Sequence, residues 1–242
     1  MKLKIFSDLH CEFGSIHLID ELFNDDVDYY VIAGDLTNSK MIKNLLFEIN
    51  KITNHPVIYV PGNHEYYHSQ KQYIDNELKE FKNTNIIVLN DDVHIDNDFV
   101  FIGGTGWWSG GITSYHISAM NDFSLIYDIK FNDNGCKWGK KTKKFFQNSL
   151  RKYKDKRMIC ITHNMPSDRC VHIDYVGSPL NVCFAMNYDD LIEDYKPELW
   201  ICGHTHDTIN MMLFDTRILC NPYGYYPYQE NKYFKNDLIF EL

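Results

Sequence analysis

The sequence predicts an α/β protein in which two mixed β-sheets pack face to face and helices cover their outer surfaces. Short apolar runs rich in β-branched residues alternate with helix-length segments through the first 90 residues, a pattern typical of parallel strands joined by helices. The chain closes with three further strand-like segments, which we expect to be antiparallel. With 242 residues, of which 44% are hydrophobic, the chain can bury one large core, and we expect a single domain over residues 1–242.

The first part of the chain is expected to alternate strands with helices. Strands are predicted at 2–7, 28–33, 56–60 and 86–89, and helices at 16–23, 41–52 and 69–81. In the segment 41–52, the apolar residues Met41, Leu45 and Ile49 fall on one helical face. The apolar stretches 93–95 and 99–102 flank a polar tripeptide, which predicts a hairpin.

Two long loops interrupt the second part of the chain. Residues 103–135 are rich in Gly, Ser, Asn and aromatic residues, and we expect a loop with one short helix there. Loops of this length are usually lids or binding segments. The remaining elements are predicted as a helix at 138–153, a strand at 157–162, a second long loop at 164–186, a helix at 188–195, a strand at 199–202, and closing strands at 208–214, 217–220 and 237–241.

Charge and cysteine content restrict the possible partners and the compartment. The net charge of −9 argues against a long duplex nucleic acid as partner, but it is compatible with a nucleotide at a metal centre. The seven cysteines are an odd set without CxxC spacing, which favours a reducing cytoplasm over a disulfide framework. The apolar runs are of strand length and no signal peptide is recognisable at residues 1–6, so we expect no membrane contact. The oligomeric state is left open.

Five predicted strands end in residues that could bind metal ions. Each short stretch alone is also typical of a turn, a helix cap or a buried histidine. Carboxylate, imidazole and amide oxygen together favour ions such as Mn²⁺, Fe or Zn²⁺. In an extended backbone, residues separated by one position project to the same side. The pair Asp8 and His10 could therefore bind one ion together, and so could the pair His204 and His206. The candidate ligands are Asp8 and His10, Asp35, Asn63, His163, and His204 and His206, with His64 next to Asn63.

These stretches resemble the signature blocks of the calcineurin-like metallophosphoesterases. The matching blocks are Asp8-x-His10, Gly34-Asp35, Gly62-Asn63-His64-Glu65, Thr162-His163 and Gly203-His204-Thr205-His206. The last block is similar to the phosphodiesterase-like side of the superfamily, and the tail at 220–225 resembles a bacterial and phage branch. The resemblance implies a four-layer fold, with two sheets sandwiched between helices and a two-metal site at the strand ends.

The resemblance also implies a role for each residue. Asp8, His10 and His206 would hold one metal, Asn63, His163 and His204 would hold the second, and Asp35 would bridge the two. The ions would be Mn, Fe, Zn or Ni. Two metals about 3.5–4 Å apart can share a hydroxide that attacks phosphorus in line. His64 would bind a phosphoryl oxygen and donate a proton to the leaving alkoxide, and Glu65 would be structural.

The second block departs from that of the protein phosphatases in the superfamily. Those enzymes have Gly-Asp-x-x-Asp-Arg-Gly, whereas this chain has Asn38 in place of the Asp that orients the catalytic histidine, and the arginine is missing. These differences argue against protein phosphatase activity. They also leave the partner of His64 open.

Aromatic residues near the blocks suggest how a substrate could be bound. Trp107, Trp108 and Tyr67 could stack a nucleobase, although paired tryptophans can equally be core residues under a long loop. Arg169 could contact a phosphate. We therefore expect a metal-dependent hydrolase, a phosphodiesterase acting on a nucleotide-like or other small phosphoester. The alternatives are a phosphomonoesterase, a nuclease, or a non-catalytic protein-binding scaffold, which the intact ligand set and His64 disfavour.

Overall fold

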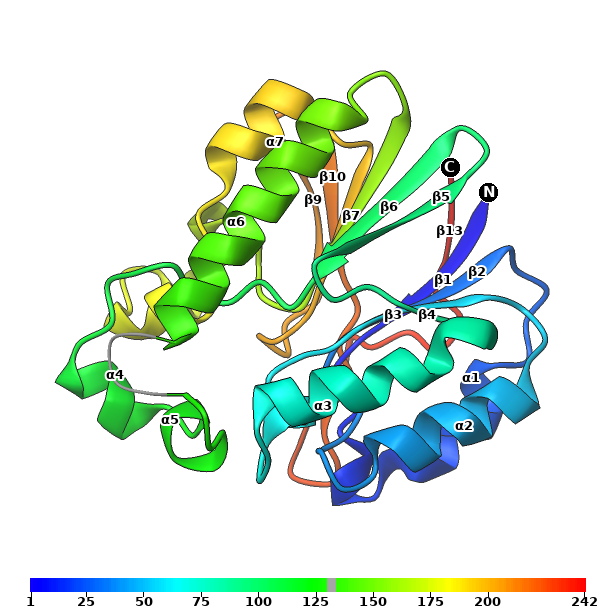
Figure 1. Cartoon of the computed structure of the whole chain (residues 1–242), viewed down its shortest axis with the longest axis horizontal. Coiled ribbons are helices and arrows are strands. Elements are labelled where there is room, and N and C mark those ends of the chain that lie inside the picture. The colour runs from blue at the N-terminus through cyan, green and yellow to red at the C-terminus, as the bar shows by residue number, and fades with distance from the viewer. Residues whose placement is uncertain (130–133) are drawn as a thin grey trace.

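Two β-sheets form the centre of the protein in the computed structural model, which describes residues 1–129 and 134–242, with only the backbone at 134–136 (Figure 1). The first sheet has the order β13-β1-β2-β3-β4, with β1 to β4 parallel and β13 antiparallel to β1. Its strands are β1 (Lys2–Phe6), β2 (Tyr29–Ala33), β3 (Val57–Val60), β4 (Ile86–Val88) and β13 (Ile239–Glu241).

The second sheet has the order β5-β6-β7-β8-β10-β9. Its inner strands β6, β7, β8 and β10 are parallel, and the edge strands β5 and β9 are antiparallel to their neighbours. Its strands are β5 (Asp92–Asp96), β6 (Phe99–Gly104), β7 (Arg157–Thr162), β8 (Leu199–Cys202), β9 (Ile209–Leu213) and β10 (Thr216–Cys220); β11 (Gly224–Tyr225) and β12 (Gln229–Glu230) form a separate hairpin. The two mixed sheets confirm the predicted fold class.

The strand at 217–220 differs from the prediction. It was expected to be antiparallel, and it is antiparallel to β9, but it pairs in parallel with β8. The reason is that β9 and β10 form a hairpin whose second strand, rather than its first, lies next to β8. The first strand of the hairpin therefore becomes the edge of the sheet.

Helices cover the outer faces of both sheets (Figure 1). The α-helices are α1 (Ile19–Leu22), α2 (Ile42–Ile52), α3 (Lys71–Leu78), α4 (Ser114–Ala119), α5 (Asp122–Leu125), α6 (Asn134–Lys152) and α7 (Asp189–Tyr195). Short 3₁₀ helices occur at Cys11–Phe13, Ser15–Leu18, His64–Tyr66, Lys79–Asn83, Asp168–Cys170, Ile173–Tyr175 and Pro179–Cys183. The loop expected at 103–135 thus contains two helices, α4 and α5, and its residues 130–133 lie outside the described part of the chain.

Three buried apolar clusters correspond to the three spaces between four layers. One cluster lies between the sheets and includes Ile5 of β1 and Ile159 of β7. A second joins the first sheet to α2 and α3, because Phe6 and Leu46 belong to it. The third joins the second sheet to α6 and α7 and includes Phe146. Ile5 and Phe6 belong to different clusters because consecutive strand residues point to opposite faces.

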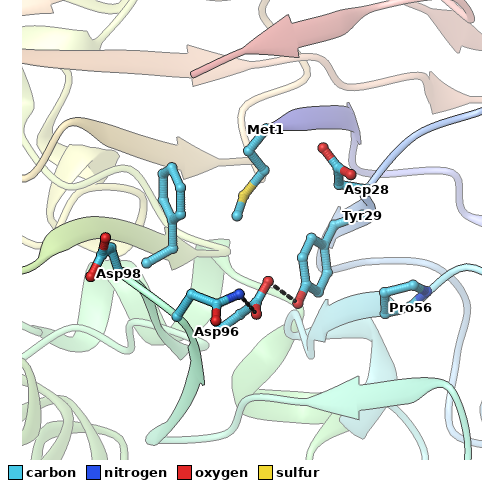
Figure 2. A pocket seen from close by; sticks show the side chains of 8 residues that line it. Met1, Asp28, Tyr29, Pro56, Asp96 and Asp98 are labelled. Atoms are coloured by element: carbon cyan, nitrogen blue, oxygen red, sulfur yellow. Dashed lines mark hydrogen bonds between the residues drawn. The ribbon is translucent and has the colours of Figure 1, made fainter.

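A hollow of about 450 Å³ lies at the amino ends of the strands (Figure 2). Met1, Asp28 and Tyr29 line it at the beginning of β1 and β2, and the hydroxyl of Tyr29 donates a hydrogen bond to Asp96 at 3.0 Å. Ligands of open α/β sheets bind at the opposite, carboxyl ends of the strands. This hollow is therefore remote from the predicted metal ligands.

Helix hydrophobicity and cysteine state are two further properties of the described residues. Within the described residues, no helix combines the length and the apolar character needed to cross a membrane. The six cysteines whose side chains are described are buried and carry free thiols. The seventh, Cys136, lies where only the backbone is described.

Candidate metal centre

The seven predicted ligands converge at the carboxyl ends of β1, β2, β3, β7 and β8. Asp8, His10 and His163 are fully buried, and Asp35 and Asn63 are 2% and 4% exposed. Their donor atoms form two clusters, with Asp8, His10 and His206 in one and Asp35, His163 and His204 in the other. Within each cluster the donor atoms lie within 4.8 Å of one another.

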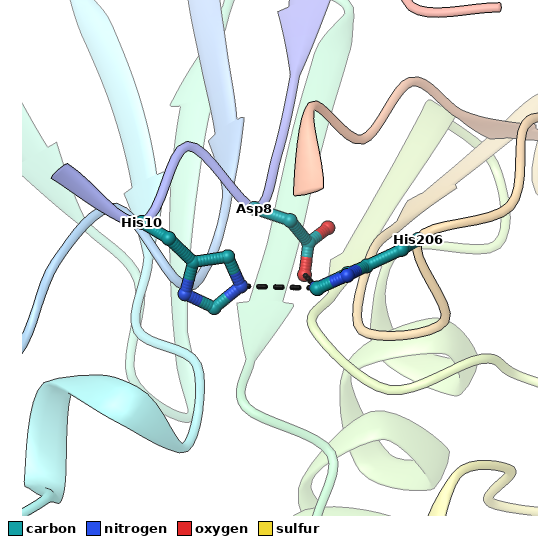
Figure 3. Close-up of side chains that lie close together, drawn as sticks. All are labelled: Asp8, His10 and His206. Carbon is teal, nitrogen blue, oxygen red and sulfur yellow. Dashed lines mark hydrogen bonds and ion pairs between the residues drawn. The ribbon is translucent and has the colours of Figure 1, made fainter. Parts of the chain in front are cut away.

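The first cluster joins the segment after β1 to the segment after β8 (Figure 3). The Nε2 atoms of His10 and His206 are 3.0 Å apart, and Nε2 of His206 is 3.7 Å from Oδ1 of Asp8. Two ligand atoms that lie about 2.1 Å from one ion at a right angle are about 3 Å apart. The spacing therefore fits adjacent ligands of a single ion.

The second cluster has similar spacing. Nε2 of His163 lies 3.0 Å from Oδ1 of Asn63 and 3.1 Å from Nδ1 of His204. Asp35 lies between the clusters, because its Oδ2 is 3.3 Å from Nε2 of His163 and 3.7 Å from Nε2 of His10. One carboxylate is thus within reach of both clusters.

The backbone at the ligands is not extended, in contrast to the prediction for the two spaced pairs. The strands end at Phe6 and Cys202, and the ligand residues that follow adopt left-handed conformations. Side chains one residue apart converge here because both residues of each pair have positive φ. Such angles are uncommon outside glycine and concentrate at functional sites. The φ values are 53° for Asp8, 46° for His10, 50° for Asp35, 75° for His204 and 55° for His206.

Glycines at Gly34 and Gly62 allow the strand ends to approach so closely. A Cβ atom on Gly34 would collide with the ring of His163, and one on Gly62 would collide with the carboxylate of Asp35. Gly34 also has a φ of 84°. The sequence blocks therefore require glycine for space beside the ligands as well as for the turn.

Burial keeps three of the ligand imidazoles neutral. Removal from water lowers the pKa of His10 and of His204, and it lowers that of His206 to about 4. For His163 burial acts in the same direction, but the carboxylates of Asp35 and Asp8 outweigh it and raise the pKa to about 10. A bound cation would displace the proton of His163, and neutral imidazoles, carboxylates and an amide oxygen are donors that divalent transition metals accept. The residues present therefore fit two divalent metal ions.

His64 has a partner that the sequence did not reveal. Its Nδ1 is 2.8 Å from Oε1 of Glu12, which lies two positions after His10 in the 3₁₀ helix Cys11–Phe13. Asn38, which occupies the position of the expected orienting Asp, instead accepts a hydrogen bond from the backbone of Lys40 at 3.1 Å. The contact joins residues that are 52 positions apart in the chain. The only signal for it in the sequence was therefore that Glu12, a carboxylate, lies close to the first block.

The charges around His64 favour its protonated form. Burial lowers the pKa of this 7% exposed imidazole, but Asp35 and Glu12 outweigh the effect and raise it above its usual value. Glu12 itself is partly buried, which opposes its charge, yet contacts with His10 and His64 lower its pKa to about 2. The Nε2 atom of His64 lies on the side of Asp35, 4.0 Å from its Oδ2. His64 also belongs to a third group of possible donors, with His10 and Asp35.

Asp122 and Tyr225 also contact the site, and neither was predicted. Asp122 of α5 accepts hydrogen bonds from Nδ2 of Asn63 at 2.8 Å and from the Tyr67 hydroxyl at 2.7 Å. The bond from Nδ2 fixes the amide so that its oxygen faces His163. The ring of Tyr225 lies 4.4 Å from that of His10 and 4.5 Å from that of His206, and its hydroxyl is 3.3 Å from Nε2 of His64.

Of the four predicted substrate contacts, one lies at the metal centre, two lie in the core and one lies on the surface. Tyr67 lies at the centre, with its ring 4.2 Å from that of His64. Trp107 and Trp108 are each only 2% exposed and belong to the core cluster of the first sheet, which corresponds to the alternative of core residues under the long loop. Arg169 lies on the surface, where its Nε is 2.8 Å from Asp189. Only Tyr67 of these four contacts the catalytic candidate His64 in the described structure.

The buried carboxylate of Glu65 joins two of the strand ends. It accepts hydrogen bonds from the backbone nitrogens of Gly62 at 2.6 Å, Leu36 at 2.7 Å and Asp35 at 3.1 Å. The side chain is fully buried. Glu65 thereby holds the turn after β2 against the turn after β3, and both turns carry ligands.

Comparison with known proteins identifies the family. The model of the calcineurin-like phosphoesterases matches residues 1–208. An uncharacterized protein of Acanthamoeba polyphaga mimivirus is 32% identical over 92% of this chain and 91% of its own length. An uncharacterized metallophosphoesterase of Helicobacter pylori (strain J99) is 28% identical over 53% of this chain, and the match spans only 34% of that relative.

A solved structure shows the same fold. The phosphopantetheinyl hydrolase from Mycobacterium tuberculosis superposes with a TM-score of 0.75 over 93% of this chain and 89% of that one, at 14% sequence identity. At this identity the likeness concerns the fold alone. The narrower assignment to a phosphodiesterase-like bacterial and phage branch stays a prediction. The chain belongs to the calcineurin-like phosphoesterase family and is a metal-dependent phosphoester hydrolase.

Proposed function

We propose that the protein hydrolyses phosphodiesters at a centre of two divalent metal ions. The proposal is carried by one observation: seven donor residues form two clusters that share the carboxylate of Asp35, with His64 beside them. Asp8, His10 and His206 would hold one ion, and Asn63, His163 and His204 the other. Such a pair of ions supplies an activated water nucleophile and neutralises charge on the phosphoryl oxygens. We propose Mn²⁺ first, with Fe, Zn²⁺ and Ni²⁺ as alternatives.

The residues around the ions have separate tasks in this proposal. His64 donates the proton that the leaving alkoxide needs, because Asp35 and Glu12 outweigh the effect of burial, raise its pKa and so favour the protonated ring. Glu12 holds the ring through Nδ1, so that Nε2 is directed to the side of Asp35. Asp122 orients the amide of Asn63. These contacts fix the positions of groups before substrate binds.

The charge around the clusters supports a diester in preference to a monoester. A monoester of phosphate carries up to two negative charges and a diester only one. A hollow lies beside His204 and His206 and is bordered by Phe184. In the described part of the chain, neither Lys nor Arg occurs among the side chains that line this hollow or contact His64. We propose a small, nucleotide-like ester as the substrate. We also propose that residues 1–242 form one domain, since β13 pairs with β1. A cytoplasmic location stays a prediction from the cysteine pattern.

Hydrolysis of two chromogenic esters tests the proposed function. With Mn²⁺ present, we expect bis-p-nitrophenyl phosphate to be cleaved with a higher kcat/KM than p-nitrophenyl phosphate. Chelation should abolish the activity and renewed addition of Mn²⁺ should restore it, because in this proposal the metal ions, and not a protein side chain, supply the nucleophile. A higher kcat/KM for the monoester would favour a phosphomonoesterase. Absence of metal-dependent turnover of both esters would contradict the proposal.

Substitution of Glu12 tests the positioning of His64. We expect Glu12→Ala to lower kcat for an alkyl phosphodiester by about 10–100-fold, a range typical of residues that orient another group of the site. Glu12→Gln keeps an oxygen that can accept from Nδ1 and should recover part of the loss. Kinetics are measured beside metal content, because Oε1 of Glu12 is also 3.5 Å from Nδ1 of His10. Glu21→Gln, on the exposed surface of α1, serves as control, and an unchanged kcat in Glu12→Ala would exclude the positioning role.

A further inference from the structure

A hollow of about 310 Å³ opens directly beside His204 and His206. One wall comes from the loop between β7 and α7, through Val171, Tyr175, Leu180 and Phe184. The other wall includes the two histidines, the Thr205-Asp207 segment and Tyr225. We call this hollow the 171–184 pocket. Its volume is at the lower end of the range for small-molecule sites.

The loop side of the 171–184 pocket is apolar and partly aromatic. The ring of Phe184 stacks on that of His204 with centroids 4.6 Å apart and planes at 30°, so the apolar wall begins at a ligand of the second cluster. Tyr175 and the neighbouring Ile173 and Val176 are 54%, 76% and 66% exposed. Ile173, Tyr175 and Val176, interrupted only by Asp174, are thus exposed apolar side chains on the loop that also supplies the apolar lining of the pocket. Asn181 and Gln229 add amide groups that can form hydrogen bonds.

The charged groups of the pocket do not suit an anion. In the described structure the lining contains no Lys or Arg, and Asp207 is its only carboxylate. Of its histidines, His204 and His206 belong to the metal clusters, and Nδ1 of His172 lies 3.3 Å from the carboxylate of Asp174. A second phosphate bound against the loop side of the pocket would face Asp207 with no Lys or Arg in the described lining to balance it. Like charges brought together at a binding surface cost enough free energy to exclude a ligand.

We propose that the 171–184 pocket binds the organic group of the phosphoester and that this group is uncharged. The group would present a ring or another apolar surface to Tyr175, Leu180 and Phe184, and polar atoms to Asn181 and Gln229. It would be about as large as a nucleoside or smaller. The substrates would then be esters with a single phosphate at the metal centre, and molecules with a further phosphate on the organic group would be rejected. This inference rests on the proposed phosphodiesterase activity.

Two matched substrates test the proposal. The p-nitrophenyl ester of thymidine 5′-phosphate is compared with the same ester bearing an additional 3′-phosphate, so that both share the scissile bond. We expect kcat/KM to be at least about 10-fold lower for the phosphorylated ester. In Leu180→Lys a cation replaces an apolar contact in the pocket, and the ratio of the two kcat/KM values should fall about 10-fold or more. Ile52→Lys, at the end of α2 and 37% exposed, adds the same charge elsewhere and should leave the ratio unchanged.

The outcomes separate this inference from the proposed function. Equal kcat/KM for the two esters in the unmodified protein, or a change in Leu180→Lys no larger than in Ile52→Lys, would overturn the assignment of the pocket. Methyl p-nitrophenyl phosphate, whose methyl group is too small to fill the pocket, reports the metal centre alone. If it is hydrolysed while the pocket results are negative, only the pocket assignment fails. If no ester is hydrolysed with metal present, the proposed function fails as well.

Discussion

Replacement of His64 by alanine is expected to lower kcat for an alkyl phosphodiester by about 10²–10⁴-fold, the range typical of a lost general acid. An alkoxide is a poor leaving group and needs a proton as the bond to phosphorus breaks. His64 is the group in position to supply it, since Glu12 holds its Nδ1 at 2.8 Å and directs Nε2 to the side of Asp35, next to the Tyr225 hydroxyl. Metal content should stay near that of the unmodified protein, because seven other donors remain in the two clusters.

The leaving group provides an internal check on this prediction. p-Nitrophenolate departs without a proton, so His64→Ala should slow p-nitrophenyl esters much less than alkyl esters. His94→Ala is a matched control, because this half-buried histidine also lies beside a hydroxyl, 3.3 Å from that of Tyr29, but near the amino ends of the strands. Equal losses with both leaving groups, at full metal content, would point to a role in binding and not in proton transfer. Metal loss in His64→Ala would make His64 a ligand, as its grouping with His10 and Asp35 allows.

Removal of the Glu65 carboxylate is expected to lower the free energy of unfolding by about 3 kcal/mol or more. Glu65→Ala leaves the backbone N–H groups of Gly62, Leu36 and Asp35 buried without acceptors, and each such group costs about 1–3 kcal/mol. Urea unfolding followed by circular dichroism measures the change, with chelator present so that metal binding does not contribute.

A surface glutamate provides the control for Glu65. Glu80 pairs with Lys43 at 2.8 Å, but its side chain is 50% exposed, and Glu80→Ala should cost at most about 1 kcal/mol. Glu65→Gln keeps one acceptor oxygen and should lie between the two alanine variants. If Glu65→Ala were as stable as Glu80→Ala, the carboxylate would not be what holds the two turns together.

The sequence predicted the strands well because strand ends coincide with changes in side-chain chemistry. The strands at 157–162 and 199–202 match β7 and β8, since each is an apolar run that stops at a polar ligand block. Pairing direction was harder to predict. Whether the strand at 217–220 lies next to β8 or at the edge depends on how the β9–β10 hairpin docks, which is a tertiary choice.

The site was predictable where ligands follow strands and unpredictable where distant segments meet. Asp8, Asp35 and His163 lie within two residues of the ends of buried strands, and their convergence follows from parallel pairing. Glu12 reaches the site from the 3₁₀ helix Cys11–Phe13, and Asp122 from a short helix inside a predicted loop, so no periodic pattern marks them. The burial of Trp107 could not be separated from an exposed stacking role, because aromatic residues serve both purposes.

The left-handed backbone at five of the predicted ligands lowers the stability of the fold, although activity requires the side chains at these positions. Each non-glycine residue in this conformation costs about 1–2 kcal/mol relative to a relaxed backbone. Glycine would remove that cost at His10, His204 or His206, and it would also remove the donor atom. A search for thermostable variants carried out without metal would therefore enrich substitutions that destroy the centre. The same search with metal present would retain the histidines, because ions bound to the folded state offset the strain. Metal supply during selection thus decides whether evolution of this chain keeps an enzyme or yields a stable, inactive fold.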